Sequence, residues 1–221
     1  MQPYPSIETV FTRDKVTNRL NFGVLRNSAN AIIKSWTVSE KIDGTNIRVI
    51  VTLAGIEIKG RSDNAQIHPH LVDAVRSLFS HEKLVEYFTA YRGSELPDGW
   101  SVTFYGEGYG AGVQKGSCYS PTKKFRCFDL MLGADWWVDD DEMRRVCGEL
   151  GVPVVPHLGY FDSIPETREE LQRVVPFSLV AQAENGNDTT QAEGIVAKPT
   201  VVLKDRHGDR VVWKLTFREF K

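Results

Sequence analysis

The chain has 221 residues, enough to bury a hydrophobic core without disulfides or other covalent links. Hydrophobic residues make up 41% and charged residues 25% of it, values that exclude a disordered or fibrous protein. The formal net charge is -2, so any binding of nucleic acid would have to use a local basic face rather than a basic whole.

The N-terminal segment and the cysteines indicate the cellular compartment in which the protein folds. The first residues lack the apolar stretch of a signal peptide, and no apolar run approaches the ~20 residues of a membrane helix. Cys118, Cys127 and Cys147 are odd in number and form no C-x-x-C pair, which argues against a disulfide framework and a cysteine-rich zinc site. We expect a soluble cytoplasmic protein without membrane contact, folded as a single domain over residues 1–221.

The first half of the chain predicts a hairpin and a helical region. Two β-branched runs, residues 47–53 and 56–60, flank Ala54-Gly55 and predict a tight turn between two strands. From residue 69 to 88, apolar residues recur near helical spacing with a break at Ser80-His81, so we expect one interrupted helix or two. His68-Pro69-His70 is better explained as the start of that helix than as a metal site.

The second half is expected to be richer in strands. Strands at 102–105 and 125–132 flank a glycine-rich connection at 106–116. Acidic N-terminal residues predict helices over 139–150 and 165–174. The adjacent Trp136-Trp137 should point to opposite faces of a strand, one buried and one exposed. The elements expected to close the chain are a polar loop at 184–190 and strands at 193–198, 200–203 and 210–216.

The segment from Glu40 to Asn46, Glu-Lys-Ile-Asp-Gly-Thr-Asn, places Lys41 after an apolar strand and before an Asp-Gly turn. A lysine amine becomes a nucleophile when desolvation, nearby cations or a metal lower its pKa. The turn would let the backbone approach a ligand, and Asp43 could hold a hydrated metal. Because lysines before such turns are common on protein surfaces, this segment alone does not decide a function.

Three further residues have the same ambiguity when each is taken alone. Glu107 and Glu193 are carboxylates beside glycine at strand edges, able to meet a ribose hydroxyl or a hydrated Mg²⁺. Lys214 lies in an apolar strand and could face a phosphate, although such a lysine is usually the exposed side of an edge strand. Gly106 to Ala111 also fits G-x-G-x-x-A, but a dinucleotide site needs a helix there, and further glycines follow instead.

The order of these segments is more informative than any one of them. Lys-x-Asp-Gly at 41–44 is followed by Arg61, Gly-Glu-Gly at 106–108, Phe-Arg-Cys-Phe-Asp at 125–129, Glu-Gly-Ile-Val-Ala-Lys at 193–198 and Val-Val-Trp-Lys at 211–214. This series resembles the covalent nucleotidyltransferases, the superfamily of polynucleotide ligases and mRNA capping enzymes. The chain looks most like the RNA ligase 2-type subgroup, because Glu40 precedes the lysine and Asn46 replaces the arginine usual in DNA ligases and capping enzymes.

The resemblance implies a fold and a site. The fold is α+β, an adenylation domain with two mainly antiparallel sheets around a nucleotide cleft and helices outside. Lys41 would attack the α-phosphate of ATP and hold AMP as a lysyl phosphoramidate, with Asp43, Glu193 and Lys214 as its catalytic partners. The other implied roles are Mg²⁺ or Mn²⁺ binding by Asp43, Glu107 and Glu193, nucleoside contacts by Glu40, Asn46, Glu107 and Phe128, and phosphate contacts by Arg61, Lys198 and Lys214.

The function implied is an ATP-dependent RNA ligase that adenylylates a 5′-phosphate end and seals it to a 3′-hydroxyl, as in RNA repair. Its partners would be RNA ends, in a single strand, a nicked duplex, an RNA/DNA hybrid or a broken tRNA. We expect a monomer that acts in the cytoplasm, either of its own cell or, if a phage encodes it, of the host cell. The segments 115–126 and 198–221 each carry a local charge of about +4 that suits polynucleotide binding, or they are two solvated edges.

Two departures keep alternatives open. Thr216 stands where the family commonly has a second basic residue, and the sequence ends at Lys221, a few residues after this motif. We therefore expect either a minimal ligase or an excised adenylyltransferase domain, without the C-terminal domain that full-length ligases of the family use. A minimal DNA ligase, a capping-type nucleotidyltransferase and a noncatalytic nucleic-acid-binding module therefore remain as alternatives.

Overall fold

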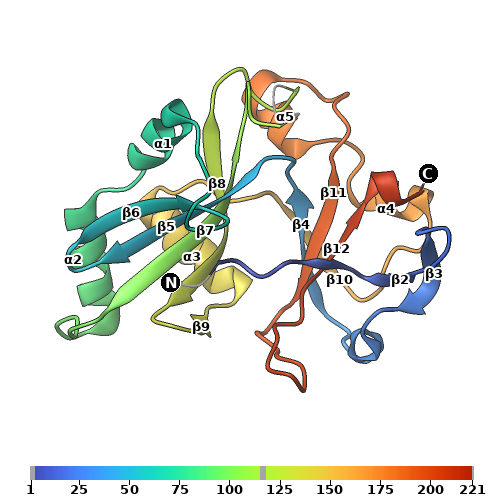
Figure 1. The fold of residues 1–221 in the computed structure, drawn as a ribbon, viewed down its shortest axis with the longest axis horizontal. Coiled ribbons are helices and arrows are strands. Elements are labelled where there is room, and N and C mark those ends of the chain that lie inside the picture. Colours follow the sequence, from blue (N-terminus) through green and yellow to red (C-terminus); the bar gives the residue numbers. More distant parts are fainter. Residues whose placement is uncertain (1–2, 115–117, 221) are drawn as a thin grey trace. The chain divides into compact units, whose positions relative to one another are not determined.

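The structure, a computed structural model, describes residues 3–114 and 118–220 (Figure 1). The chain forms two compact units. The first contains Pro5 and the residues before it together with Asp43–Val154, and the second contains Ser6–Ile42 and the residues from Val155 onward.

The first unit is built on a five-stranded antiparallel sheet in the order β6-β5-β7-β8-β9. The hairpin predicted from the β-branched runs is confirmed, because β5 and β6 pair across the Ala54-Gly55 turn, from Ile47 opposite Gly60 to Thr52 opposite Gly55. The strands are β5 (Thr45–Thr52), β6 (Gly55–Gly60), β7 (Ser101–Tyr109), β8 (Lys124–Leu132) and β9 (Trp136–Trp137).

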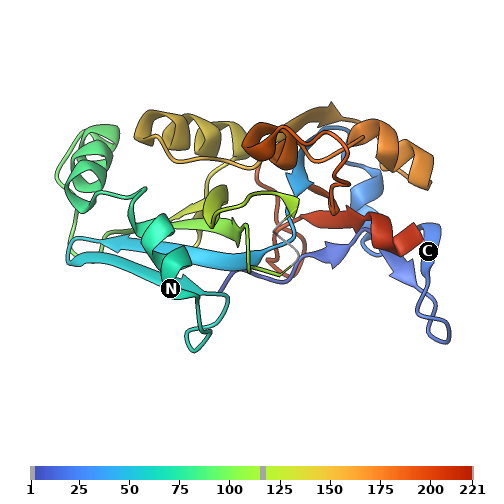
Figure 2. The same ribbon diagram turned by 90° about the horizontal axis from the view of Figure 1, so that it is seen from above.

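Helices α1 (Pro69–Arg76), α2 (His81–Arg92) and α3 (Asp140–Leu150) cover one face of this sheet. The predicted break is confirmed: the Ser80 side chain accepts from Lys83 N and caps the start of α2. The interpretation of His68 as a helix start is also confirmed, since its side chain accepts from His70 N. Figure 2 shows α3 lying along one side of the sheet.

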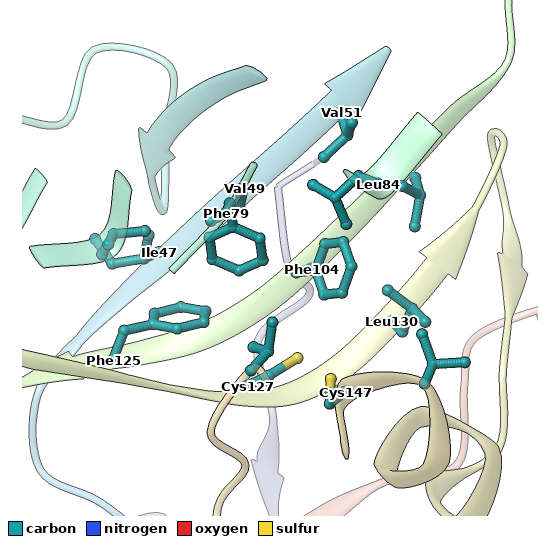
Figure 3. Close-up of a cluster of buried hydrophobic side chains, with 14 of the residues drawn as sticks. Ile47, Val49, Val51, Phe79, Leu84, Phe104, Phe125, Cys127, Leu130 and Cys147 are labelled. Atoms are coloured by element: carbon teal, nitrogen blue, oxygen red, sulfur yellow. The ribbon is translucent and has the colours of Figure 1, made fainter. Parts of the chain in front are cut away.

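The core of the first unit lies between the sheet and these helices. Figure 3 shows Ile47, Val49 and Val51 of β5 facing the same interior as Phe104, Phe125 and Leu130, with Leu84 from α2. On β9, Trp137 is 7% exposed and Trp136 71% exposed, which confirms the expected opposite directions. None of Cys118, Cys127 and Cys147 takes part in a disulfide in the described part of the chain.

The second unit contains a five-stranded sheet in the order β1-β12-β11-β4-β10, in which β1 runs parallel to β12 and the other pairs are antiparallel. Its core includes Trp36, Val38, Ile195 and Leu215, with Leu171 from α4. Its elements are β1 (Glu8–Thr9), β2 (Phe11–Arg13), β3 (Leu20–Leu25), η1 (Ser28–Ala31), β4 (Trp36–Lys41), β10 (His157–Phe161), α4 (Arg168–Val174), α5 (Leu179–Asn185), β11 (Gly194–Pro199), β12 (Trp213–Thr216) and η3 (Phe217–Phe220).

The α+β fold class is confirmed, while three local expectations were wrong. The connection predicted from residue 106 is strand as far as Tyr109, because Gly106 and Gly108 pair with β8 and β5. Residues 200–203 form no strand, and the chain there makes a single bridge, between Lys204 and Arg210. The polar loop predicted from residue 184 begins later, because α5 continues to Asn185. Among the described residues, no helix is long and apolar enough to cross a membrane.

Candidate functional site

Three lysines share one face of the sheet in the second unit. Side chains alternate between the two faces of a strand, so Lys41 points away from the core face that holds Val38. Lys214 lies opposite Val196, which in turn lies opposite Ser39 of β4, two residues from Lys41. Lys198 lies opposite Thr37. The register therefore places Lys41, Lys198 and Lys214 on the face away from the core.

Lys41 is paired with a carboxylate on this face. Its Nζ donates to Glu193 Oε2 at 2.6 Å, and the two side chains are 23% and 16% exposed. Glu193 directly precedes β11, where Gly194 lies opposite Lys41. Burial, and secondly the positive charge of Lys41, lower the pKa of Lys214. The face thus concentrates cations that water screens only in part, a setting that favours polyanion binding.

Gly194 allows the strands to approach each other closely at this point. Its φ is +157°, and a Cβ there would lie 2.1 Å from the carbonyl oxygen of Leu215. Thr216 lies opposite Gly194 and is fully buried, and its Oγ1 has no hydrogen-bond partner among the described residues. Thr216, the residue that departs from the family pattern, therefore has an unsatisfied hydroxyl and lies in register with Gly194 and Lys41 across the three strands.

Glu40 lies on the opposite face of β4 from Lys41. Its side chain is buried, 1% exposed, with Oε1 accepting from Ser178 Oγ at 2.5 Å and Oε2 from Val180 N at 3.2 Å. The carboxylate thereby binds the N-terminus of α5, where unpaired N–H groups favour a negative charge. Sequence reasoning did not find this role, and the nucleoside contact expected of Glu40 remains a prediction.

The remaining predicted residues lie in the first unit. The turn at Asp43-Gly44 packs against β7, because a Cβ on Gly44 would lie 2.3 Å from the carbonyl oxygen of Gly108 and 2.9 Å from Glu107 Cγ. The Asp43 N–H donates to the Tyr119 hydroxyl at 3.4 Å. Glycine at position 44 therefore lets the Asp43 turn lie beside the strand that carries Glu107.

Asn46, Glu107 and Arg126 lie opposite one another on three neighbouring strands. Asn46 Oδ1 is buried and has no hydrogen-bond partner in the described part of the chain. Arg126 donates Nε to the Tyr109 hydroxyl at 2.9 Å and Nη1 to the carbonyl oxygen of Val154 at 3.0 Å. This polar row contains two predicted residues and one, Arg126, that sequence reasoning had assigned only to a basic segment.

Phe128 occupies a β-bulge of β8. Tyr105 lies opposite Asp129 and Gly106 opposite Cys127, so Phe128 is an extra residue between the two pairs. Bulges bend a strand and redirect a side chain, and they are frequent beside active sites. The half-buried Phe128 ring is therefore not held by regular strand pairing.

Arg61 is exposed and follows β6 directly. The turn that carries it is fixed by Arg48 of β5, which is fully buried. Arg48 donates Nε to the carbonyl oxygen of Gly60 at 2.9 Å and Nη2 to Asp63 Oδ1 at 2.8 Å. The hydrogen bond from Arg48, followed by its charge, lowers the pKa of Asp63.

The basic segments and the metal ligands were also expected from the sequence. In the segment 115–126, Lys123 donates to the carbonyl oxygen of Ala111 at 2.7 Å and Arg126 donates to the Tyr109 hydroxyl. Both cations therefore make hydrogen bonds within the protein. Lys115 and Lys221 lie outside the described residues. Among described residues, no group of three or more His, Cys, Asp or Glu forms a metal cluster. Asp43 and Glu107 belong to the first unit and Glu193 to the second.

Comparison with solved structures shows what the fold is similar to. A variant of a Naegleria gruberi RNA ligase without ligand matches 100% of this chain and 59% of its own, with a TM-score of 0.62 and 16% identity. Another variant of that ligase, with ATP and Mn, matches 96% and 59%, with a TM-score of 0.60 and 18% identity. An archaeal ATP-dependent RNA ligase matches 99% and 49%, with a TM-score of 0.61 and 19% identity.

The chain thus spans from about half to three fifths of the length of these solved ligases. No curated protein sequence matches it. Residues 34–216, which include every residue expected at the site, match the RNA ligase family, and the chain belongs to that family.

Proposed function

We propose that the chain is an ATP-dependent RNA ligase that seals a 5′-phosphate to a 3′-hydroxyl through a lysyl-AMP intermediate. The observation that carries the proposal is the partly buried Lys41–Glu193 pair on a sheet face that also holds Lys198 and Lys214. Family membership and the ATP-bound and Mn-bound Naegleria ligase support it.

In the first step, the Lys41 amine releases Glu193, loses a proton to solvent and attacks the α-phosphorus of ATP. A P–N bond forms, the bond from the α-phosphorus to its bridging oxygen breaks, and pyrophosphate leaves. Lys214 and Lys198 would hold phosphate oxygens as point charges, with Arg61 adding a guanidinium that can bind two oxygens at once. Asn46 and Phe128 would hold the nucleoside, with the unpartnered Asn46 Oδ1 as an acceptor.

We expect the reaction to use a divalent cation. The carboxylates of Asp43, Glu107 and Glu193 are hard oxygen ligands, which Mg²⁺ and Mn²⁺ prefer. When bound, the cation supplies positive charge that offsets the triphosphate and favours the neutral form of the lysine amine. Glu193 would then exchange its contact with Lys41 for a contact with the hydrated ion.

The two later steps transfer AMP and release it. An oxygen of the RNA 5′-phosphate attacks the phosphorus of lysyl-AMP, the P–N bond breaks, and Lys41 regains a proton. The 3′-hydroxyl oxygen then attacks the RNA phosphorus of the 5′–5′ pyrophosphate link, its proton leaves, and AMP departs. Lys41 is required only until AMP has left it.

The substrate would be RNA ends, bound by a monomer. The experiment is a sealing assay with 5′-phosphate RNA as a single strand, as a nicked duplex and in an RNA/DNA hybrid, each with ATP and Mg²⁺ or Mn²⁺. We expect Lys41→Ala to abolish ATP-dependent sealing yet to seal chemically pre-adenylated RNA. Lys34→Ala is the matched control, because Lys34 is an exposed lysine of the same unit whose Nζ contacts the carbonyl oxygen of Ala31.

Two results would overturn the proposal. If Lys41→Ala sealed 5′-phosphate RNA with ATP as well as the unmodified chain does, lysyl-AMP would not be the intermediate. If the unmodified chain sealed DNA ends and left RNA ends open, the substrate assignment would be wrong.

A further inference from the structure

Tyr4 packs into an aromatic group of the first unit. It is 6% exposed, and its ring centroid lies 5.0 Å from that of Phe128, edge-on at 71°. The centroids of Tyr105 and Trp137 lie 5.1 Å and 5.6 Å away. Tyr4 precedes the segment that matches the RNA ligase family, so family membership assigns it no role.

The hydroxyl group fixes the direction of this ring. It donates to Asp129 Oδ2 at 2.7 Å, and Asp129 is fully buried. A hydrogen bond to a buried carboxylate is among the stronger ones in proteins, and a partner lost there leaves a costly unpaired group. Tyr4 is therefore anchored at its hydroxyl while its ring meets Phe128.

Tyr4 touches the β-bulge on both of its strands. Tyr105 and Asp129 are the register pair on one side of the extra residue Phe128, and Tyr4 contacts all three. Regular pairing does not fix the direction of an extra residue. The contacts of Tyr4 supply a constraint on the Phe128 ring that the ladder of β7 and β8 does not.

We infer that Tyr4 is a positioning residue that orients Phe128 to stack on the adenine of ATP. The inference rests on the proposed function, in which Phe128 contacts the adenine. Aromatic stacking depends on the relative orientation of the rings, and a ring that must be ordered during binding lowers affinity. Tyr4 acts on ATP binding through Phe128 and takes no part in bond making.

The test measures KM for ATP and the maximal rate of AMP transfer to Lys41 with radiolabelled ATP. We expect Tyr4→Leu and Tyr4→Met to raise KM about 3- to 10-fold, the range that corresponds to one aromatic edge-to-face contact, with the maximal rate within about twofold. Tyr4→Phe, which keeps the ring and loses the hydrogen bond to Asp129, should raise KM by less than Tyr4→Leu and Tyr4→Met do. Methionine has about the volume of leucine but is more flexible and can adapt to an irregular gap, so the methionine variant replaces the leucine variant if that one does not fold.

A double-mutant cycle with Phe128→Ala separates positioning from a general loss of structure. If Tyr4 acts through Phe128, adding Tyr4→Leu to Phe128→Ala changes KM no further. The matched control is Tyr91→Leu, because the Tyr91 hydroxyl also donates to a carboxylate, that of Glu142, and its ring packs on Phe88. We expect the control to leave KM unchanged.

The inference is overturned if Tyr4→Leu or Tyr4→Met keeps the unmodified KM, or if the effects of Tyr4 and Phe128 on KM multiply in the double variant. In both cases the unmodified chain still forms its AMP adduct, so the proposed function stands. An unmodified chain that forms no AMP adduct overturns the proposed function, and the inference with it.

Discussion

Glu40→Gln tests the contact between β4 and α5. The carboxylate accepts hydrogen bonds from the Ser178 hydroxyl and from the Val180 N–H, and Glu40 is 1% exposed. Glutamine keeps one acceptor oxygen and turns an NH₂ group toward a donor. A hydrogen bond to a charged group is worth about 1.5–3 kcal/mol, so we expect the free energy of unfolding to fall by about 2 kcal/mol. For a chain of this size, that lowers Tm by about 4–8 °C.

The assay is urea and thermal unfolding followed by circular dichroism, combined with Ser178→Ala in a double-mutant cycle. Because the two groups share a hydrogen bond, we expect their effects to be non-additive by about 1 kcal/mol. A Glu40→Gln variant whose free energy of unfolding lies within about 0.5 kcal/mol of that of the unmodified chain, yet which needs more ATP for adenylation, would show that the Glu40 contact does not stabilise α5. The carboxylate would then serve the nucleotide and not α5.

Lys214→Met should leave Tm unchanged or raise it while slowing AMP transfer at least about tenfold, because burial and the charge of Lys41 lower the Lys214 pKa and so oppose folding with that amine charged; a lower Tm would contradict this. The hydrogen bond from Arg145 lowers the pKa of Glu142 to about 2, so its stabilising contribution is present above its usual pKa of 4.5 and is lost as pH falls toward 2. Tm of Glu142→Gln should therefore fall less between about pH 5 and 3 than that of the unmodified chain, and parallel curves would disprove the linkage. Gly194→Ala should lower Tm sharply, since its Cβ would lie 2.1 Å from the Leu215 carbonyl oxygen; an unchanged Tm would show that the strands can separate there at little cost.

Elements with local signals were predictable from the sequence. The hairpin of β5 and β6, and the break before α2, follow from β-branched runs and from Ser80 as an N-cap. Elements that depend on distant contacts were not. Gly106 and Gly108 both belong to β7. A Cβ at Gly106 would collide with Phe125 and one at Gly108 with Leu71, so the absence of side chains at these positions makes room for the core.

Helix α5 is another element that local patterns did not reveal. Its N-terminal groups bind Glu40, which lies 138 residues from Ser178 in the sequence. The residues next to α5 in the sequence give no indication that Glu40 is its partner. The expectation of a polar loop from residue 184 consequently began too early.

Some residues of the candidate site were likewise predictable from the sequence, and others were not. The resemblance marked Lys41 and Glu193, which lie 152 residues apart in the sequence and are in contact in the structure. It did not mark Arg48 or Tyr4, because the role of each depends on what its side chain touches, a turn for Arg48 and a bulge for Tyr4. Neither contact has a signature in residue type or spacing.

The proposed function requires that Lys41 carry AMP as a covalent adduct. The most direct measurement is the intact mass of the purified chain after incubation with Mg²⁺ and ATP, beside GTP and the Lys41→Ala variant, each first treated with pyrophosphate to remove bound AMP. We expect a gain of one AMP group with ATP, none with GTP, and none in the variant. An adduct of equal amount in Lys41→Ala, or no adduct in the unmodified chain, would contradict it.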